Sequence, residues 1–276
     1  MVQRFSTGQQ LNVGVVGATG LVGTMIREIL AERKFPVAEL RLFASARSAG
    51  STVEWQGRTI TIEDAATANY DELDIVLFSA GGSTSKAIAP KAAAAGAIVI
   101  DNSSAYRGDP QVPLVVSEVN PHALNDIPKG IVANPNCTTM AAMPALKPLH
   151  DAAGLKRLTV STYQAVSGAG VAGIDILSRQ LATVGDRAAE LAHHGDADFL
   201  PAAEKWAVPM AHNVVPFNYV LAEDGYTEEE IKLRDESRKI LEIPGLPVSG
   251  TCVRVPVFTG HSLSINAEFE RPISAE

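Results

Sequence analysis

A cysteine at the junction of an expected strand and an expected helix is the first candidate for chemistry. Cys137 follows Asn136 and the apolar run 130–133, which predicts a short buried strand, and residues 138–152 predict a helix. At such a junction a thiol meets unpaired backbone N–H groups and the positive end of the helix dipole, which favour the nucleophilic thiolate. The alternative is a small buried hydrophobic residue, against which the polar, turn-forming flanks argue.

A glycine-rich turn near the N-terminus predicts a dinucleotide site. The apolar strand 12–16 runs into Gly17-Ala18-Thr19-Gly20-Leu21-Val22-Gly23, and a helix is expected over 20–32. We expect one buried face on that helix, formed by Val22, Met25, Ile26, Ile29 and Leu30. Glycines let the backbone approach a pyrophosphate at the helix N-terminus. The spacing is GxxGxxG rather than GxGxxG, so a purely structural turn stays open.

The end of the second predicted strand, 39–44, indicates which nicotinamide is used. The chain continues with Ser45, Arg47 and Ser48 and has no carboxylate there. Two hydroxyls and a guanidinium suit a 2′-phosphate, so NADP is favoured over NAD. The alternative is a solvated loop arginine. Together the predicted cofactor-binding residues are Gly17, Thr19, Gly20, Leu21, Val22, Ser45, Arg47, Ser48 and Gly81, the last at the end of a further strand.

Strands and helices alternate through about residue 136, which is typical of an α/β, doubly wound parallel sheet. The predicted strands are 12–16, 39–44, 58–62, 74–79, 97–101, 113–117 and 130–133, with helices over 20–32 and 83–95. We therefore expect residues 1–136 to form an NADP-binding Rossmann-like domain and 137–276 an α+β catalytic, substrate and dimerisation domain.

The second half has its own pattern of elements. We expect a strand over 156–164, a helix-like stretch over 171–195, a helix over 226–241 and a strand over 251–258. The run from Thr227 to Glu230 resembles a capping box at the start of the second of these helices. On the last strand, Cys252 and Arg254 share a face that we interpret as polar.

Composition limits the classes of protein. The 276 residues carry a net charge of −8 and no basic run, which argues against a nucleic-acid surface. The chain shows no apolar segment of membrane-spanning length and no signal-peptide core, and its two cysteines cannot build a disulfide framework. These features favour a cytoplasmic enzyme. His193, His194, Asp196 and Asp198 fit a polar surface loop better than a metal site, so no metal is expected.

Basic residues outside these motifs could serve a substrate. His261 follows a glycine at a strand end, where an acid/base role competes with the commoner structural role. Arg107, Lys232 and Arg254 are separated in the sequence of an acidic protein. They could hold an anion together, but their spacing does not show that they converge.

The ordered set of motifs resembles the aspartate-β-semialdehyde dehydrogenases. The resemblance rests on the glycine turn, Ser45-Ala46-Arg47-Ser48, the run 101–107, Asn134-Pro135-Asn136-Cys137-Thr138-Thr139, the run 163–168, and Cys252-Val253-Arg254-Val255 leading to His261. It implies NADPH-dependent reduction of β-aspartyl phosphate to aspartate semialdehyde with release of phosphate, through a cysteine thioacyl intermediate. It further implies a step of aspartate-family amino-acid biosynthesis, performed by a homodimer.

The resemblance also implies roles for single residues. Cys137 is implied as the nucleophile, His261 as the general acid/base, and Asn136 as an aid at the acyl oxygen. The implied substrate contacts are Gln164 at the amino-acid end, Arg254 at the carboxylate, Glu230 at the ammonium group, Arg107 and Lys232 at the phosphate, with Ser167 and Gly168 beside them.

Two further interpretations stay open. A related reductase of N-acetylglutamyl phosphate would share fold, thiol and cofactor, but a carboxylate such as Glu230 would have no ammonium group to meet. Family chains normally continue for several dozen residues after the strand that ends this sequence, with a last helix that packs on the cofactor domain. A truncated, non-catalytic NADP-binding remnant is therefore the second alternative.

Overall fold

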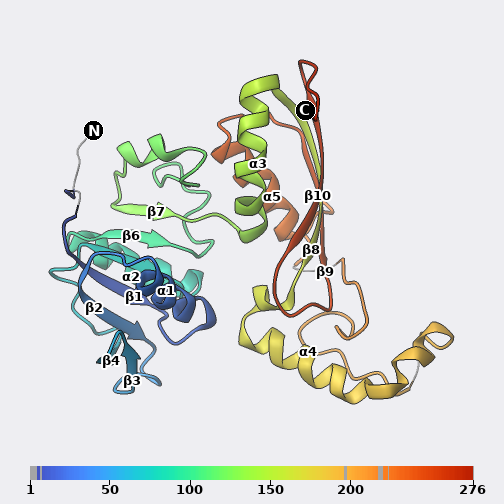
Figure 1. The fold of residues 1–276 in the computed structure, drawn as a ribbon, viewed down its shortest axis with the longest axis horizontal. Coiled ribbons are helices and arrows are strands. Elements are labelled where there is room, and N and C mark those ends of the chain that lie inside the picture. Colours follow the sequence, from blue (N-terminus) through green and yellow to red (C-terminus); the bar gives the residue numbers. More distant parts are fainter. Residues whose placement is uncertain (1–4, 7, 196–197, 217–219, 223, 276) are drawn as a thin grey trace. The chain divides into compact units, whose positions relative to one another are not determined.

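The structure is a computed structural model that describes every residue except 1–4, 7, 196–197, 217–219, 223 and 276. The chain divides into two compact units, Met1–Asn136 and Cys137–Glu276 (Figure 1). Each unit has its own sheet and its own core, and each is described by itself. Among the described helices, none is long and apolar enough to cross a bilayer.

The first unit is built on a seven-stranded sheet with the order β3-β4-β2-β1-β5-β6-β7. Its strands are β1 (Leu11–Val16), β2 (Val37–Ala44), β3 (Thr52–Trp55), β4 (Arg58–Asp64), β5 (Ile75–Phe78), β6 (Ile98–Asp101) and β7 (Ile131–Ala133). All neighbours are parallel except β3 and β4. Because β1 is central and almost wholly apolar, it is buried on both sides, as a parallel strand must be.

Two helices and a 3-10 turn connect these strands. They are α1 (Leu21–Glu32), α2 (Gly82–Ala94) and η1 (Pro121–Asn125). From the centre of the sheet, α1 leads to β2 on one side and α2 leads from β5 to β6 on the other. Right-handed crossovers in opposite directions place the two helices on opposite faces. This confirms the predicted doubly wound fold.

One predicted strand, 113–117, is wrong. Only Leu114 pairs, through an isolated bridge to Ala133. The Asn120 side chain accepts a hydrogen bond from the Val116 N–H and donates one to the Leu114 carbonyl. These two backbone groups are therefore not available to pair with a neighbouring strand. The short antiparallel strand β3 was not predicted.

The predicted buried face of α1 is also wrong in part. Leu30 is buried and Ile26 packs on the core, but Val22, Met25 and Ile29 are exposed. The cause lies at Gly23, where an added Cβ would stand only 2.2 Å from the Gly17 carbonyl oxygen. Helix α1 therefore packs on the sheet through the face that carries Gly23. The adjacent face, with Val22, Met25 and Ile29, points to solvent.

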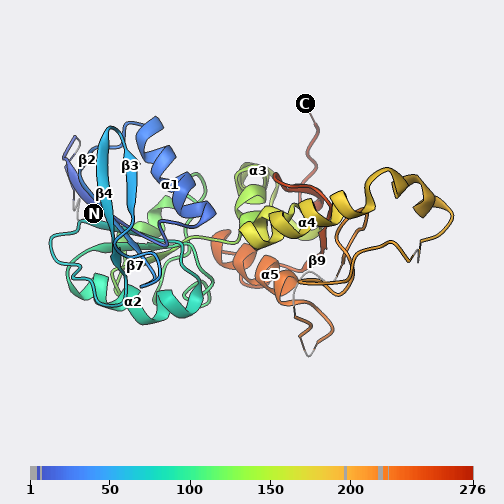
Figure 2. The ribbon, with the colours of Figure 1, turned by 90° about the horizontal axis from the view of Figure 1, so that it is seen from below.

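The second unit is a three-stranded sheet, β10-β8-β9, with helices packed on it (Figure 1). Its elements are α3 (Cys137–Ala153), β8 (Leu155–Gln164), η2 (Val166–Ala169), α4 (Val171–Val184), η3 (Gly185–Ala192), α5 (Glu228–Ile240), β9 (Val248–Arg254) and β10 (Ser262–Phe269). Helix α3 packs on β8 and β10, and α5 on β9. Figure 2 shows α4 leading into a long excursion of the chain, and this part has a core of its own around Leu177, Trp206 and Met210.

Two expectations for the second unit need correction. The strand predicted over 251–258 ends at Arg254, because Val255 and Val257 turn away to meet the end of β8 and η2. Strand β10 was missed. The face shared by Cys252 and Arg254 is the buried face of β9, although an arginine lies on it. The Thr227–Glu230 capping box is confirmed.

Candidate active site

The carboxyl ends of β1, β2, β4 and β5 surround a cavity of about 660 Å³ in the first unit. Its lining residues are Val16, Gly17, Thr19, Gly20, Ala44, Ser45, Ala46, Asp64, Ala65, Ala66, Ser79, Ala80, Ser83, Thr84, Ala87, Ile88 and Lys91. This is the edge at which an open α/β sheet binds its ligand.

The glycines of the turn shape one wall of this cavity. Gly17 has a φ of 86°, and an added Cβ would lie 2.3 Å from the Ser79 carbonyl oxygen. Gly20 is the N-cap residue of α1 and has no side chain with which to cap it, so the first N–H groups of the helix face its N-terminal end. A backbone cradle at a helix N-terminus fits the phosphates of a dinucleotide.

The predicted cofactor residues divide into two groups. Gly17, Thr19, Gly20 and Ser45 line the cavity. Among the residues that the structure describes, the lining does not include Leu21, Val22, Arg47, Ser48 or Gly81. Arg47 is exposed on the turn that follows β2. Sequence reasoning missed Asp64 and Lys91, although the predicted strand 58–62 pointed to the position of Asp64 at the same edge.

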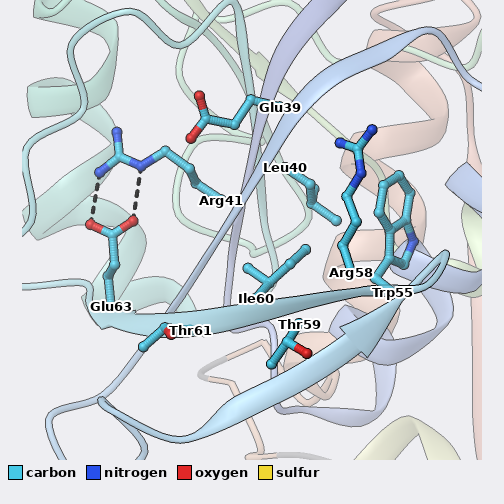
Figure 3. A pocket seen from close by; sticks show the side chains of 9 residues that line it. All are labelled: Glu39, Leu40, Arg41, Trp55, Arg58, Thr59, Ile60, Thr61 and Glu63. Atoms are coloured by element: carbon cyan, nitrogen blue, oxygen red, sulfur yellow. Dashed lines mark hydrogen bonds and ion pairs between the residues drawn. The ribbon is translucent and has the colours of Figure 1, made fainter.

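A smaller cavity, about 320 Å³, lies where β2 and β4 diverge (Figure 3). Pairing between these strands starts only at Leu42 and Ile62, which leaves a gap beside Leu40 and Ile60. Arg41 spans one side of it with two hydrogen bonds to Glu63, of 2.8 and 2.7 Å. No predicted site residue lines this cavity among those described.

Cys137 is the first residue of α3 in the second unit, as the sequence predicts, and it is exposed. Its electrostatic state differs from the expectation. Burial on its protein side and the Glu229 carboxylate raise the pKa of the thiol, while N–H groups of Thr138 and Cys137 and the Arg254 guanidinium oppose them. The N–H groups at the helix terminus act in the predicted direction, but desolvation and the Glu229 carboxylate outweigh them, and the pKa of the thiol is raised.

His261 lies just before β10 and is fixed by the backbone. Its Nδ1 accepts a hydrogen bond of 2.9 Å from the Ala165 N–H. In the neutral ring the proton is therefore on Nε2, which can donate to an oxygen. Burial lowers the pKa of His261, Arg254 lowers it further, and Glu229 opposes both. Arg254 and Glu229 thus influence the pKa of both the Cys137 thiol and the His261 imidazole.

Arg254 is the largest fully buried side chain, with 1% of its surface exposed. It donates to the Ala165 carbonyl, so one residue at the end of β8 holds both Arg254 and His261. A Cβ at Gly168 would stand 2.9 Å from Arg254 Nη1 and 3.4 Å from His261 Cε1. Gly168 therefore lies against both groups, as its predicted place in the site requires.

Glu229, on α5, completes this centre and was missed by sequence reasoning. It is 1% exposed, and its Oε1 accepts a hydrogen bond of 3.0 Å from Gln164 Nε2. Its Oε2 lies 3.7 Å from the Lys232 ammonium. Gln164, Glu229, Lys232, Arg254, His261 and Cys137 thus form one network of contacts and charges within the second unit.

Glu230, the predicted contact for an ammonium group, has another task. Its Oε2 accepts from the Thr227 N–H at 2.7 Å, and its Oε1 accepts from the Cys252 N–H at 3.2 Å. Glu230 caps α5 and ties that helix to β9, while the preceding glutamate faces the site. Both carboxylate oxygens of Glu230 are thus engaged by backbone N–H groups, and its role as the ammonium contact stays a prediction.

The remaining predicted residues are placed as follows. Arg107 donates from Nε to the Asn134 carbonyl and from Nη2 to the Asn102 carbonyl, both at 2.9 Å. Asn136 is buried at the end of the first unit. The Ser167 N–H bonds the Phe258 carbonyl beside η2. Arg107 and Asn136 belong to the first unit, so their convergence with the centre around Cys137 stays a prediction.

Of the histidine and aspartate cluster in the excursion, Asp196 lies outside the described residues. Among the residues that are described, no group of three or more His, Cys, Asp or Glu side chains could hold a metal ion.

Two protein-family models match this chain, one in each unit. Residues 12–127 match the family model described as semialdehyde dehydrogenase, NAD binding domain. Residues 146–276 match the one described as semialdehyde dehydrogenase, dimerisation domain.

Relatives and solved structures narrow the class. The chain is 64% identical to an aspartate-semialdehyde dehydrogenase from Streptomyces akiyoshiensis over 268 residues, covering 96% of this chain and 78% of the relative. It is 50% identical to that of Aquifex aeolicus, covering 96% and 75%. A structure of aspartate semialdehyde dehydrogenase II from Vibrio cholerae complexed with ASA superposes with a TM-score of 0.89 at 44% identity, covering 96% and 76%. The chain belongs to the aspartate-semialdehyde dehydrogenase family.

Proposed function

We propose that this protein interconverts β-aspartyl phosphate and aspartate semialdehyde, with NADP as cofactor and release or uptake of phosphate. The family membership and the 64% identity to a named aspartate-semialdehyde dehydrogenase support the reaction. In the cell it would supply aspartate-family amino-acid biosynthesis.

One observation carries the proposal. A buried guanidinium, Arg254, and a buried carboxylate, Glu229, both act on the Cys137 thiol and the His261 imidazole. A substrate with a carboxylate and an ammonium group at one end and a carbonyl at the other matches these opposite charges beside a nucleophile. Arg254 can take the carboxylate through two parallel hydrogen bonds. Glu229, rather than Glu230, then takes the ammonium group.

Cys137 performs the covalent step. Its sulfur attacks the acyl carbon of the aspartyl phosphate, the bond from that carbon to the phosphate oxygen breaks, and the thiol proton leaves with the released phosphate. The N–H groups of Cys137 and Thr138 lie at the sulfur, where they can also stabilise the oxyanion. When bound, NADPH supplies the hydride that reduces the thioester. The carbon–sulfur bond then breaks, which releases the aldehyde and returns the sulfur as thiolate, to be protonated from solvent.

His261 assists as a donor at the reacting oxygen. Its Nε2–H is available for this because Nδ1 already accepts from the Ala165 N–H. The general acid/base role implied by the family would require a proton on Nδ1 as well, at the expense of that bond. Arg107 and Lys232 are proposed for the phosphate, with Asn136 at the acyl oxygen.

The cofactor site supports NADP. The Gly17 cradle and the N-terminus of α1 would hold the pyrophosphate, while Ser45, Arg47 and Ser48 follow β2 at the ribose position. The structure of an aspartate semialdehyde dehydrogenase from Candida albicans with NADP matches this chain with a TM-score of 0.68 at 29% identity, covering 96% of this chain and 73% of that one. This supports the same cofactor here.

We also propose that the protein works as a homodimer in the cytoplasm. The second unit matches a model named for dimerisation. Arg157, Thr159 and Tyr163 alternate along β8 on its exposed face, which offers a surface for a second copy. A reducing compartment would keep the Cys137 thiol available.

The test is an assay of NADP reduction by purified protein with aspartate semialdehyde, with and without phosphate. We expect turnover that depends on phosphate and is slower with NAD. N-acetylglutamate semialdehyde is the matched control substrate. Preference for the N-acetylated aldehyde would overturn the proposal, as would cofactor binding without turnover of either substrate.

A further inference from the structure

A buried hydroxyl stands behind the substrate-binding network. Thr162, on β8, is fully buried, and its Oγ1 lies 2.9 Å from Gln164 Oε1. The Val253 N–H of the neighbouring strand lies 3.3 Å from the same Oγ1. Strand pairing sets this arrangement, because β8 and β9 are parallel and in register from Leu158 to Gln164.

The direction of these hydrogen bonds follows from their end points. The Val253 N–H can only donate, so the Thr162 oxygen accepts there and its single proton goes to Gln164 Oε1. The Gln164 amide must then present Nε2 on its other side. There Nε2 donates at 3.0 Å to Glu229, whose ionised carboxylate only accepts.

We propose that Thr162 is a positioning residue, whose hydroxyl fixes the orientation of the Gln164 amide and thereby holds the Glu229 carboxylate in place for the ammonium group of the substrate. This rests on the proposed function, in which Glu229 is the ammonium contact. Thr162 itself touches no substrate. It acts through Gln164, at the inner end of a chain of bonds that begins at the backbone of β9.

The consequence of losing the hydroxyl is specific. Without its proton, the Gln164 oxygen loses a donor, and this chain of bonds fixes the amide through the Glu229 carboxylate alone, so the amide is held less firmly and can rotate. Its oxygen would then face the Glu229 carboxylate, and a buried carboxylate that loses a donor is costly. The Arg254 and His261 bonds to Ala165 do not pass through Thr162. Carboxylate binding and the thiol step should therefore be spared.

The experiment compares two substrates in four proteins. Wild type, Thr162→Val, Thr162→Ser and Thr52→Val are assayed with aspartate semialdehyde and with succinate semialdehyde, the same aldehyde without the ammonium group. Thr52 is an exposed strand threonine on β3 of the first unit, outside the cofactor cavity, so it is the matched control for the loss of a hydroxyl.

For Thr162→Val we expect kcat/KM for aspartate semialdehyde to fall about tenfold, mainly through KM, the size expected when one buried hydrogen bond is lost. Turnover of succinate semialdehyde should change by less than about twofold, since that substrate does not use Glu229. Thr162→Ser should restore wild-type values, and Thr52→Val should match wild type. Equal losses on both substrates, or a serine variant as poor as the valine variant, would overturn the proposal.

A second measurement does not depend on activity. The side-chain NH₂ group of Gln164, followed by NMR, should exchange slowly with solvent in wild type and Thr162→Ser and faster in Thr162→Ala, which removes the hydroxyl without adding bulk if the valine variant does not fold. Unchanged exchange would overturn the proposal. Wild type without activity on aspartate semialdehyde but with the predicted exchange pattern would count against the proposed function and in favour of the Thr162 role.

Discussion

Two regions of the molecule differ in the groups that form them: the cavity at the carboxyl edge of the first sheet, here the cofactor edge, and the network of Gln164, Glu229, Arg254 and His261 around Cys137, here the charged centre. The cofactor edge uses backbone and small side chains, Gly17 and Ala80 among them, and its shape depends on close approach. The charged centre uses long side chains from α5, β8 and β9, buried and held by one another. The first kind of site tolerates no added atoms, whereas the second tolerates no lost or misdirected hydrogen bond.

Substitutions in the two regions should therefore have different effects. A clash at the cofactor edge damages folding and cofactor binding together. A changed charge at the second centre leaves the fold intact and alters the chemistry of Cys137 and the choice of substrate. The predictions that follow use this difference, from the largest effect to the smallest.

Cys137→Ser should abolish turnover and leave NADP affinity nearly unchanged. A serine hydroxyl lacks the acidity and the nucleophilicity of a thiol, so the loss should exceed about 1,000-fold. Steady-state assays and cofactor titration measure the two effects. Cys252→Ser is the control, because Cys252 is fully buried and burial raises its pKa to about 12. Turnover of the Cys137 variant within about tenfold of wild type would contradict the nucleophile assignment.

Gly17→Ala should destabilise the protein much more than Gly81→Ala. Both glycines have a positive φ, of 86° and 83°, so each alanine has a backbone cost of about 1–2 kcal/mol. Only at Gly17 does the new Cβ meet backbone, 2.3 Å from the Ser79 oxygen, which adds about 1–3 kcal/mol for overpacking. Urea denaturation measures both variants. Equal losses would show that the close approach has no energetic weight.

Glu229→Gln should lower kcat/KM for aspartate semialdehyde by about 10–100-fold, since a hydrogen bond to a charged group is worth about 1.5–3 kcal/mol. Glu230→Gln should instead lower the melting temperature, because Glu230 caps α5 and bonds the Cys252 N–H. Kinetics and thermal unfolding of both variants separate the roles. The reverse pattern would restore Glu230 as the ammonium contact.

Arg47→Ala should weaken NADP binding by about 1–3 kcal/mol and leave NAD binding unchanged, as expected for the loss of a charged partner of the 2′-phosphate. Arg47 is exposed on the turn after β2, and Ser45 of the same turn lines the cavity. Titration with each cofactor measures the change. Equal weakening of both would assign Arg47 to the loop instead.

The two regions also differ in how far the sequence predicted them. The strand, the glycine turn and the helix of the cofactor edge are contiguous, so local pattern was sufficient for Gly17, Thr19 and Gly20. It failed for the buried face of α1, because the close packing of Gly23 on Gly17 depends on how helix and strand meet. Lys91 was missed because it reaches the cavity from the third turn of α2.

In the second unit the residue types were predicted better than their tasks. Cys137, Gln164, Arg254 and His261 do share one centre, but strands far apart in sequence bring them together, which no spacing could show. The proposal of Glu229 in place of Glu230 has a basis in the local sequence. A capping box engages the carboxylate of its fourth residue, so the motif already occupied Glu230.

The most direct test of the account is the pH dependence of Cys137 alkylation in the cofactor-free protein. The central claim is that the protein packed on one side of Cys137 desolvates the thiol and, with the Glu229 carboxylate, holds its pKa above the ordinary cysteine value, against the helix N-terminus and Arg254. Below its pKa, a thiol with a raised pKa has less thiolate and reacts more slowly. Glu229→Gln removes the negative charge, so it should lower the pKa of the Cys137 thiol and speed its alkylation at pH 8. A wild-type thiol that titrates below the ordinary value, or a rate that Glu229→Gln leaves unchanged, would contradict the account.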